Sequence, residues 1–489
     1  MIYRTLCLSV LPAILAVSLF GSGAAEAANS GLQVTQSNPE ITRAEIEAHV
    51  KFLASDELQG RETGSAGSRA ASEYLAKAFK EAGLEPAGDD GTFFQLVPME
   101  RIEYTGKPEL YFLSAGGETS IAKWGTDFDL GGGDLRSTGT LIIKTVSEDS
   151  DLPSEDAPQR AFFLNGDRGL TRSWTGSLRA PGRAGLIMEI GRSKLGSEKK
   201  KNPRNPRNPL VVGTPRATRV RLRGDWIDRA KAGEFVSVRL EQGMKSELIS
   251  ERNVVGKISG VGTKDAPEMA AETLIYSAHF DHIGVSDRPE RVAEGEEPDQ
   301  IRNGADDDAS GVAAVLELAE AYAAGEPPAR TLLFLLVTGE EIGLVGTEYY
   351  LDHPLVPLKD TVCNLNFEMI GRPDELIGGA GKLWLSGYEY STLADSIEQS
   401  GVAIAADARP DQQFFKRSDN YAFVKRGIVA QTLSSYNLHQ DYHRPSDEAD
   451  TLDYEHMEAC VKSAFQGFEL LVNGSILPAW REGIDPKEL

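Results

Sequence analysis

Residues 273–279 read TLIYSAH, residues 303–324 read NGADDDASGVAAVLELAEAYAA, and residues 331–341 read TLLFLLVTGEE. An apolar run of strand length is followed by a polar turn, an alanine-rich helical stretch and a second apolar run. Strands that are apolar along their whole length are typical of parallel sheets covered by helices on both faces. The alternation continues towards the C-terminus, so this part of the chain is predicted to be a three-layer α/β/α sandwich.

Side chains of the kinds that bind metals lie at the ends of these apolar runs or in glycine-flanked turns. In chain order they are His279, an aspartate within Asp306-Asp307-Asp308, the pair Glu340-Glu341, Glu368 and His443. Imidazole and carboxylate ligands without thiolates suit Zn2+. In an adjacent glutamate pair, one member can bind a metal while the other carries a proton. The set therefore predicts a hydrolase with two metal ions.

The acidic triplet and the glutamate pair each leave an assignment open. A carboxylate in the turn Asp306-Asp307-Asp308 can bridge two cations, and one of the three is expected to cap the following helix instead. Spacing does not decide which one bridges. Glu340 and Glu341 end an apolar strand, where two carboxylates are costly unless cations compensate them.

Some histidines are expected to bind metal, and the others are not. Asp281, two residues after His279, can hold the second ring nitrogen of that histidine and fix its tautomer. His282 is expected to lie behind the ligands or on the surface. The remaining histidines are expected to be structural or exposed: His49, His353, His439 and His456.

Other chemistries have little support in the sequence. There is no GxSxG turn for a serine nucleophile and no phosphate-binding P-loop or dinucleotide-binding motif. The chain has 489 residues and a formal net charge of -23, which argues against nucleic acid as a partner.

The N-terminus predicts export. Arg4 precedes an apolar run from Leu6 to Phe20, and small residues with the triplet Ala25-Glu26-Ala27 follow, as in a secretory signal peptide spanning residues 1–27. We therefore expect the periplasm or the medium as the location, with no membrane attachment after cleavage. Cys363 and Cys460 lie in apolar stretches and are expected to be buried free thiols.

The middle of the chain differs from both flanks. Residues 125–241 contain short β-like runs separated by glycine, proline and charged residues, together with a basic loop, Lys199–Pro209. We expect an inserted β-rich domain there and a solvated loop. The main domain then comprises residues 28–124 and 242–489.

Several motifs occur in the order seen in a known family. They are LASDELQGRETGSAG, SAHFDHIG, NGADDDASG, TGEEIGLVGTEYY, NFEMIGR, RSDNYAF and DYHRPSDEADTLD. The chain resembles the secreted co-catalytic di-zinc aminopeptidases, which share a superfamily with glutamate carboxypeptidase and the transferrin receptor. The resemblance implies a mixed central sheet, a peptide substrate and a protease-associated-like insert.

The resemblance also implies a ligand set for two Zn2+ ions per chain. Asp307 would bridge the two ions. His279 and Glu368 would complete one site, and Glu341 and His443 the other. The best-known aminopeptidases carry aspartate where this chain has Glu368. Glutamate is one methylene longer and can still bind the metal, but it could change how the substrate amine is held.

Three further roles follow from the same resemblance. Glu340 would be the general base and acid, Asp281 would orient His279, and Tyr442 would help to stabilise the tetrahedral intermediate. The peptide bond between Asp307 and Asp308 would be cis.

Three other functions compete with an aminopeptidase. A carboxypeptidase or dipeptidase of the same superfamily would share these ligands, whereas a glutaminyl cyclase usually has one zinc and no insert. A catalytically silent receptor on the same fold should have lost ligands or the base, and this chain keeps all of them. Side-chain preference and oligomeric state are not predicted.

Overall fold

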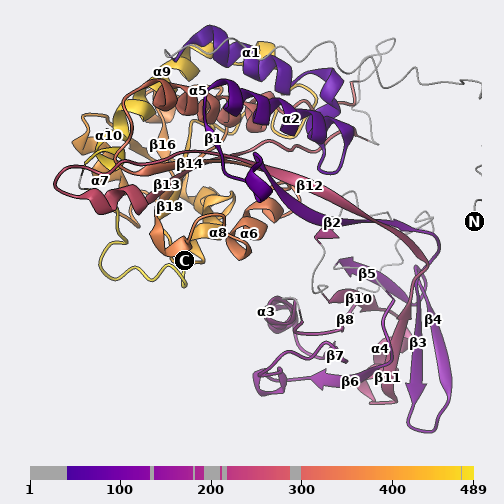
Figure 1. The fold of residues 1–489 in the computed structure, drawn as a ribbon. Helices are drawn as coiled ribbons and strands as arrows, with labels where there is room; N and C mark the ends of the chain where they lie inside the picture. Colours follow the sequence, from indigo (N-terminus) through magenta and orange to yellow (C-terminus); the bar gives the residue numbers. More distant parts are fainter. Residues whose placement is uncertain are drawn as a thin grey trace, which may run out of the picture.

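The computed structural model describes residues 41–132, 137–179, 182–191, 210–211, 217–286, 299–474 and 476–489, which form two sheets with their helices (Figure 1). The predicted signal peptide and the loop Lys199–Pro209 lie outside the described residues. Within the described part, no helix has the length and apolar character needed to cross a membrane.

The larger sheet is mixed, as expected, and its central strands are parallel. Strands β14, β13, β15 and β18 run in one direction, with antiparallel neighbours β12 and β16 on either side. The order is β17 (Ala405–Ala406), β16 (Trp384–Leu385), β18 (Ala430–Ser434), β15 (Thr361–Phe367), β13 (Thr273–His279), β14 (Thr331–Val337), β12 (Met244–Ile258), β2 (Phe94–Tyr104) and β9 (Leu210–Val211), with β1 (Glu85–Pro86) paired to β12.

Helices cover both faces of the larger sheet, which confirms the predicted sandwich (Figure 1). On β14, Leu332, Phe334 and Leu336 pack on one face, and the alternate residues between them pack on the other. The first face is covered by α1 (Arg43–Leu53), α2 (Ala66–Glu81), α5 (Gly311–Ala324) and α9 (Tyr454–Gly467), and the second by α6 (Val345–Asp352) and α8 (Asn420–Val424). Two short helices, α7 (Leu393–Gln399) and α10 (Glu469–Val472), pack beside α9.

The smaller sheet has its own core and two helices, α3 (Arg168–Leu178) and α4 (Asp225–Lys231). Its order is β4 (Thr119–Lys123), β3 (Glu109–Ser114), β11 (Phe235–Glu241), β6 (Leu141–Val146), β7 (Arg160–Leu164), β8 (Leu186–Ile190), β10 (Thr218–Leu222) and β5 (Phe128–Gly132).

The long strands β2 and β12 connect the two sheets (Figure 1). They pair antiparallel from Phe94 opposite Val254 to Tyr104 opposite Met244. The smaller sheet begins at Glu109, so the predicted start of the insert at residue 125 is too late. The hairpin of β3 and β4 precedes that boundary and pairs with β11, a partner distant in sequence that local patterns do not reveal.

A buried arginine from the N-terminal motif holds the loops that follow the central strands. Arg61 is completely buried in the turn between α1 and α2, and its guanidinium donates to four backbone carbonyls of the described residues. The distances are 2.7 Å to the oxygen of Phe280, 2.6 Å to that of Asn303 and 3.0 Å to that of Gly304. A fourth bond goes to the carbonyl of Leu53. One side chain therefore fixes the loop after β13 and the start of the acidic turn together.

Replacing Arg61 with methionine should leave these carbonyls without donors in a buried environment. We expect Arg61→Met to lower the free energy of unfolding by at least about 3 kcal/mol. Amide exchange should also become faster around residues 303–310. Denaturant unfolding and hydrogen exchange would measure both effects, with Lys80→Met, an exposed position on α2, as the control. Equal behaviour of the two variants would contradict this role.

A second buried polar contact joins α1 to α5. The Oε2 atom of Glu317 accepts a hydrogen bond of 3.1 Å from the backbone N–H of Thr42, and Oε1 lies 3.8 Å from Nε2 of His49. Burial raises the pKa of Glu317 to about 8 and lowers the pKa of His49 to about 4. The folded chain thus keeps a proton on Glu317 at neutral pH while His49 stays uncharged.

Between pH 6.5 and 8, only Glu317 of this pair should make stability depend on pH. The unfolded chain has lost the Glu317 proton there and the folded chain retains it, so the free energy of unfolding falls as pH rises, by up to about 1.4 kcal/mol per unit. Glu317→Gln should flatten this slope and be more stable than the parent at pH 8. Unfolding titrations across this range would test it, and Glu326→Gln, at an exposed position, should keep the parent slope.

Candidate metal centre

The candidate ligands meet because neighbouring parallel strands end at the same edge of the larger sheet. His279 ends β13, Glu340 and Glu341 follow β14, and Glu368 directly follows β15. His443 lies in the loop after β18. The carboxyl ends of parallel strands are where open α/β sheets place their sites.

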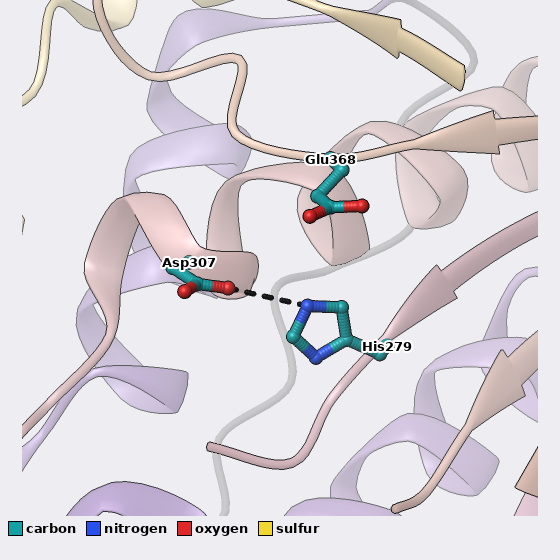
Figure 2. A group of neighbouring side chains, drawn as sticks. All are labelled: His279, Asp307 and Glu368. Carbon is teal, nitrogen blue, oxygen red and sulfur yellow. Dashed lines mark ion pairs between the residues drawn. The ribbon is translucent and has the colours of Figure 1, made fainter. Parts of the chain in front are cut away.

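Asp307 lies at the centre of the group. Its Oδ1 atom is 3.2 Å from Nε2 of His279, and Glu368 faces the same space (Figure 2). One ligand atom from each of these three side chains lies within 4.8 Å of the others, which is close enough for a shared cation. Asp307 is 3 % exposed and His279 is 1 % exposed, so the group is largely shielded from water.

The other carboxylate oxygen of Asp307 faces a second group. Nε2 of His443 is 3.1 Å from Oδ2 of Asp307 and 3.2 Å from Oε1 of Glu341. Nδ1 of His282 is 2.8 Å from the same Glu341 oxygen and 3.9 Å from Asp307. Two imidazoles therefore share one pair of carboxylates, and Asp307 alone contributes to both groups.

His282 is the residue that sequence reasoning undervalued. The surface alternative is wrong, because His282 is 1 % exposed, and its contact with Glu341 places it among the possible ligands. Its backbone N–H donates to the carbonyl of Arg61, which turns the loop inwards. The available signal was its position in the same HFDH motif as His279.

The other two members of the acidic triplet hold the loop. Asp308 accepts hydrogen bonds from the backbone N–H groups of Gly311 at 3.1 Å and Met369 at 3.0 Å, so it caps the start of α5 and joins it to the end of β15. Asp306 accepts from the N–H of Gly371 at 2.7 Å. Asp307 is thus the member that faces the histidines, and the peptide bond to Asp308 is cis, as the resemblance implied.

A second layer of charged groups surrounds the acidic turn. Asp447 accepts hydrogen bonds from the backbone N–H groups of Asp306 and Asp307, and His439 lies 3.0 Å from Asp306. Arg372 contacts His439 and Asp447. His439 is therefore structural, one of the two roles expected for it. His49 and His456 are also buried, and His353 is exposed.

Asp281 connects the loops after β13 and β14. Its carboxylate accepts from the backbone N–H of Glu340 at 3.1 Å and from the hydroxyl of Thr63 at 2.9 Å. Nδ1 of His279 lies 3.1 Å from the Asp281 carbonyl and 3.8 Å from its carboxylate. In the structure the nearer partner of the ring is therefore the backbone oxygen.

Tyr442 lies beside the centre and lines a small pocket. Its ring stacks on that of His443 at 3.9 Å between centroids, and the pocket also includes Glu368, Trp384 and Arg417. Burial raises the pKa of Tyr442, so its hydroxyl remains protonated and able to donate a hydrogen bond.

The charges at this edge require compensation. Burial raises the pKa of Glu340 well above its ordinary value, although the nearby His279 lowers it. Burial also raises the pKa of Glu341, but the neighbouring imidazoles of His282 and His443 bring it down to about 2. Burial raises the pKa of Glu368 to about 7. Cations beside these groups would favour their charged forms.

Several candidate ligand atoms have no hydrogen-bond partner in the part of the chain that the structure describes, which also indicates that cations bind here. Nε2 of His279, Nδ1 of His282, Oε1 of Glu341 and Oε2 of Glu368 are buried and accept or donate no hydrogen bond among the described residues. Buried polar atoms normally have partners. Nitrogen and oxygen donors without sulfur, in two groups joined by one carboxylate, suit two divalent cations such as Zn2+.

Comparisons with known proteins agree with this arrangement. Residues 253–466 match the model of peptidase family M28. The chain is 29% identical over 205 residues to a vacuolar membrane protease of Lachancea thermotolerans, covering 42% of this chain and 19% of that protein. It thus spans about a fifth of that relative's length.

Two bacterial aminopeptidases are similar over more of their length. Aminopeptidase YwaD of Bacillus subtilis is 23% identical over 351 residues, 67% of this chain and 70% of the relative. The structure of an aminopeptidase from Aneurinibacillus sp. strain AM-1 shares the fold with a TM-score of 0.51 and 17% identity, covering 93% of this chain and 99% of that one. Residues 253–466, which match the model of peptidase family M28, hold every candidate ligand.

Proposed function

We propose that this chain is a zinc-dependent aminopeptidase that removes N-terminal residues from peptides. The observation that carries the proposal is Asp307, whose two carboxylate oxygens face two separate ligand groups. Similarity to two bacterial aminopeptidases supports the reaction class. We also propose export, on the strength of the signal-like residues 1–27.

His279 and Glu368 would hold one zinc ion with Asp307, and Glu341 the other with His443 or His282. Bound zinc would lower the pKa of water and polarise the carbonyl of the scissile bond. The chain itself supplies the remaining chemistry, which is proton transfer, orientation and stabilisation of developing charge.

Glu340 is the proposed proton carrier. It is adjacent to a ligand, and its backbone is held by Asp281, so its carboxylate is set by the same loop that positions Glu341. As general base it would take a proton from the attacking water, and as general acid it would give that proton to the leaving amine. The protonated hydroxyl of Tyr442 would donate to the carbonyl oxygen as negative charge develops there.

Arg417 favours a second candidate function. It lines the pocket next to Glu368, and its guanidinium lies over the ring of Phe414. Among the described residues it forms no ion pair. A guanidinium in that position could bind the terminal carboxylate of a substrate, as a carboxypeptidase or dipeptidase requires. The two functions differ in which end of the peptide must be free.

Substrates blocked at one end would separate the two functions. We expect hydrolysis of an aminoacyl chromogenic substrate with a free α-amine, and little hydrolysis of its N-acetylated counterpart. Chelation should abolish activity, and zinc should restore it, with about two ions per chain by elemental analysis. Full activity without metal would refute the proposal, and a preference for N-blocked peptides with a free C-terminus would favour the carboxypeptidase.

Glu340→Gln should separate the proton carrier from the ligands. Glutamine is nearly isosteric but cannot accept the proton, so kcat should fall about 10²–10⁴-fold while zinc content and KM change little. The matched variant Glu341→Gln should lose zinc from one site. If Glu340→Gln lost metal and Glu341→Gln lost only turnover, the two roles would have to be exchanged.

A further inference from the structure

The smaller sheet contains a groove of about 1100 Å³ that lies outside the segment matched to the peptidase family. It is bordered by α3 on one side and by the face of β10 on the other. Its lining includes six arginines: Arg168, Arg172, Arg179, Arg219, Arg221 and Arg223. Among the residues that the structure describes, two acidic ones, Asp129 and Glu189, line it as well. The groove is thus strongly cationic in a chain whose formal net charge is -23.

The local structure explains why one wall is cationic. Along β10, Val220 and Leu222 belong to the core on one face of the sheet. Residues alternate between faces in a strand, so Arg219 and Arg221 project from the opposite face, and Arg223 continues the alternation just beyond the strand. On this second face the apolar cluster under α3 includes Ile187 of β8 but no residue of β10. The arginines therefore occupy sheet surface that α3 leaves uncovered.

Helix α3 supplies the other wall. Trp174 and Leu178 pack onto the sheet, whereas Arg168 and Arg172, four residues apart, share a different face of the helix and are exposed. Arg179, at the C-terminal end, also reaches the groove. The cations thus come from two walls rather than from one charged surface.

The arginines differ in their present partners. Arg219 and Arg221 lie 3.6 and 3.3 Å from the carboxylate of Glu189, and Arg223 pairs with Asp129. These ion pairs hold the β10 wall in place. Arg168, Arg172 and Arg179 form no ion pair with any residue that the structure describes. The helix wall therefore presents fixed positive charge that no described side chain neutralises.

We propose that this groove binds a phosphate-bearing anion with at least two negative charges. Guanidinium groups stay charged at all physiological pH values and donate pairs of parallel hydrogen bonds that match phosphate oxygens. Arginines on two facing walls favour a ligand with several charged groups over a single ion. The volume lies just above the range of about 300–1,000 Å³ that is usual for small-molecule pockets, so a ligand with several phosphates fits it. The phosphate could belong to a soluble compound or to a lipid headgroup.

Calorimetric titration of the full chain with tripolyphosphate would test the site. The double variant Arg168→Gln/Arg172→Gln should bind at least about tenfold more weakly, because it loses two charged donors. The control Arg43→Gln/Arg160→Gln removes the same charge from exposed positions outside the groove and should bind like the parent. Binding should weaken with added salt. Both variants should keep the parent unfolding temperature and the parent activity on a small aminoacyl substrate.

Vesicles distinguish the source of the phosphate. If the chain binds phosphatidylglycerol vesicles more tightly than tripolyphosphate, and Arg168→Gln/Arg172→Gln loses this binding, the ligand is a lipid headgroup. Tighter binding of tripolyphosphate would indicate a soluble ligand. The proposal is overturned if neither probe binds, if both double variants bind equally, or if an oligoglutamate peptide binds in preference to both probes. None of these outcomes depends on whether the chain is an aminopeptidase.

Discussion

The crowding of carboxylates at one edge of the larger sheet is the constraint on which the rest of the structure depends. Parallel strands bring Glu340, Glu341 and Glu368 to the acidic turn around Asp307, and like charges at such short distances repel one another. Positively charged and hydrogen-bonding groups around the carboxylates offset this repulsion. Histidines face Asp307, and backbone N–H groups face Asp306 and Asp308.

Support for this edge comes from parts of the chain that are distant in sequence. Arg61 and Thr63 reach it from the turn between α1 and α2, and Asp447 reaches it from the loop before α9. Each bonds to backbone or to a carboxylate that itself bonds to backbone. A ligand geometry therefore depends on three separate segments, and this explains why the N-terminal helices belong to the same body as the central strands.

Much of this arrangement follows from the sequence because the relevant signals are local. Apolar runs and the turns that follow them predicted the sandwich and the set of candidate ligands. The family resemblance carried by the ordered motifs then singled out Asp307 within the acidic triplet and Glu341 within the glutamate pair. The inward position of His282 was missed, because its motif is only a weak local signal and the turn itself depends on the bond to the Arg61 carbonyl far away in the chain. The start of the smaller sheet was misplaced for a similar reason. Strand β3 pairs with β11, which lies far away in the sequence at the other end of the insert. The arginines of β10 and α3 are unremarkable in sequence and form a groove only once helix and strand are adjacent.

The antiparallel pair of β2 and β12 has a consequence for how such a chain could arise. Tyr104 and Met244, the last paired residues before the smaller sheet, lie directly opposite each other. Antiparallel strands at that separation can be joined by a two-residue turn. The segment between them, which includes the edge strand β9 of the larger sheet, could thus be removed, and a simple hairpin would close the gap without altering the register between β2 and β12. The smaller sheet is thus an insertion between two paired strands. It could be gained, exchanged or lost in evolution without changing the edge that carries the candidate ligands.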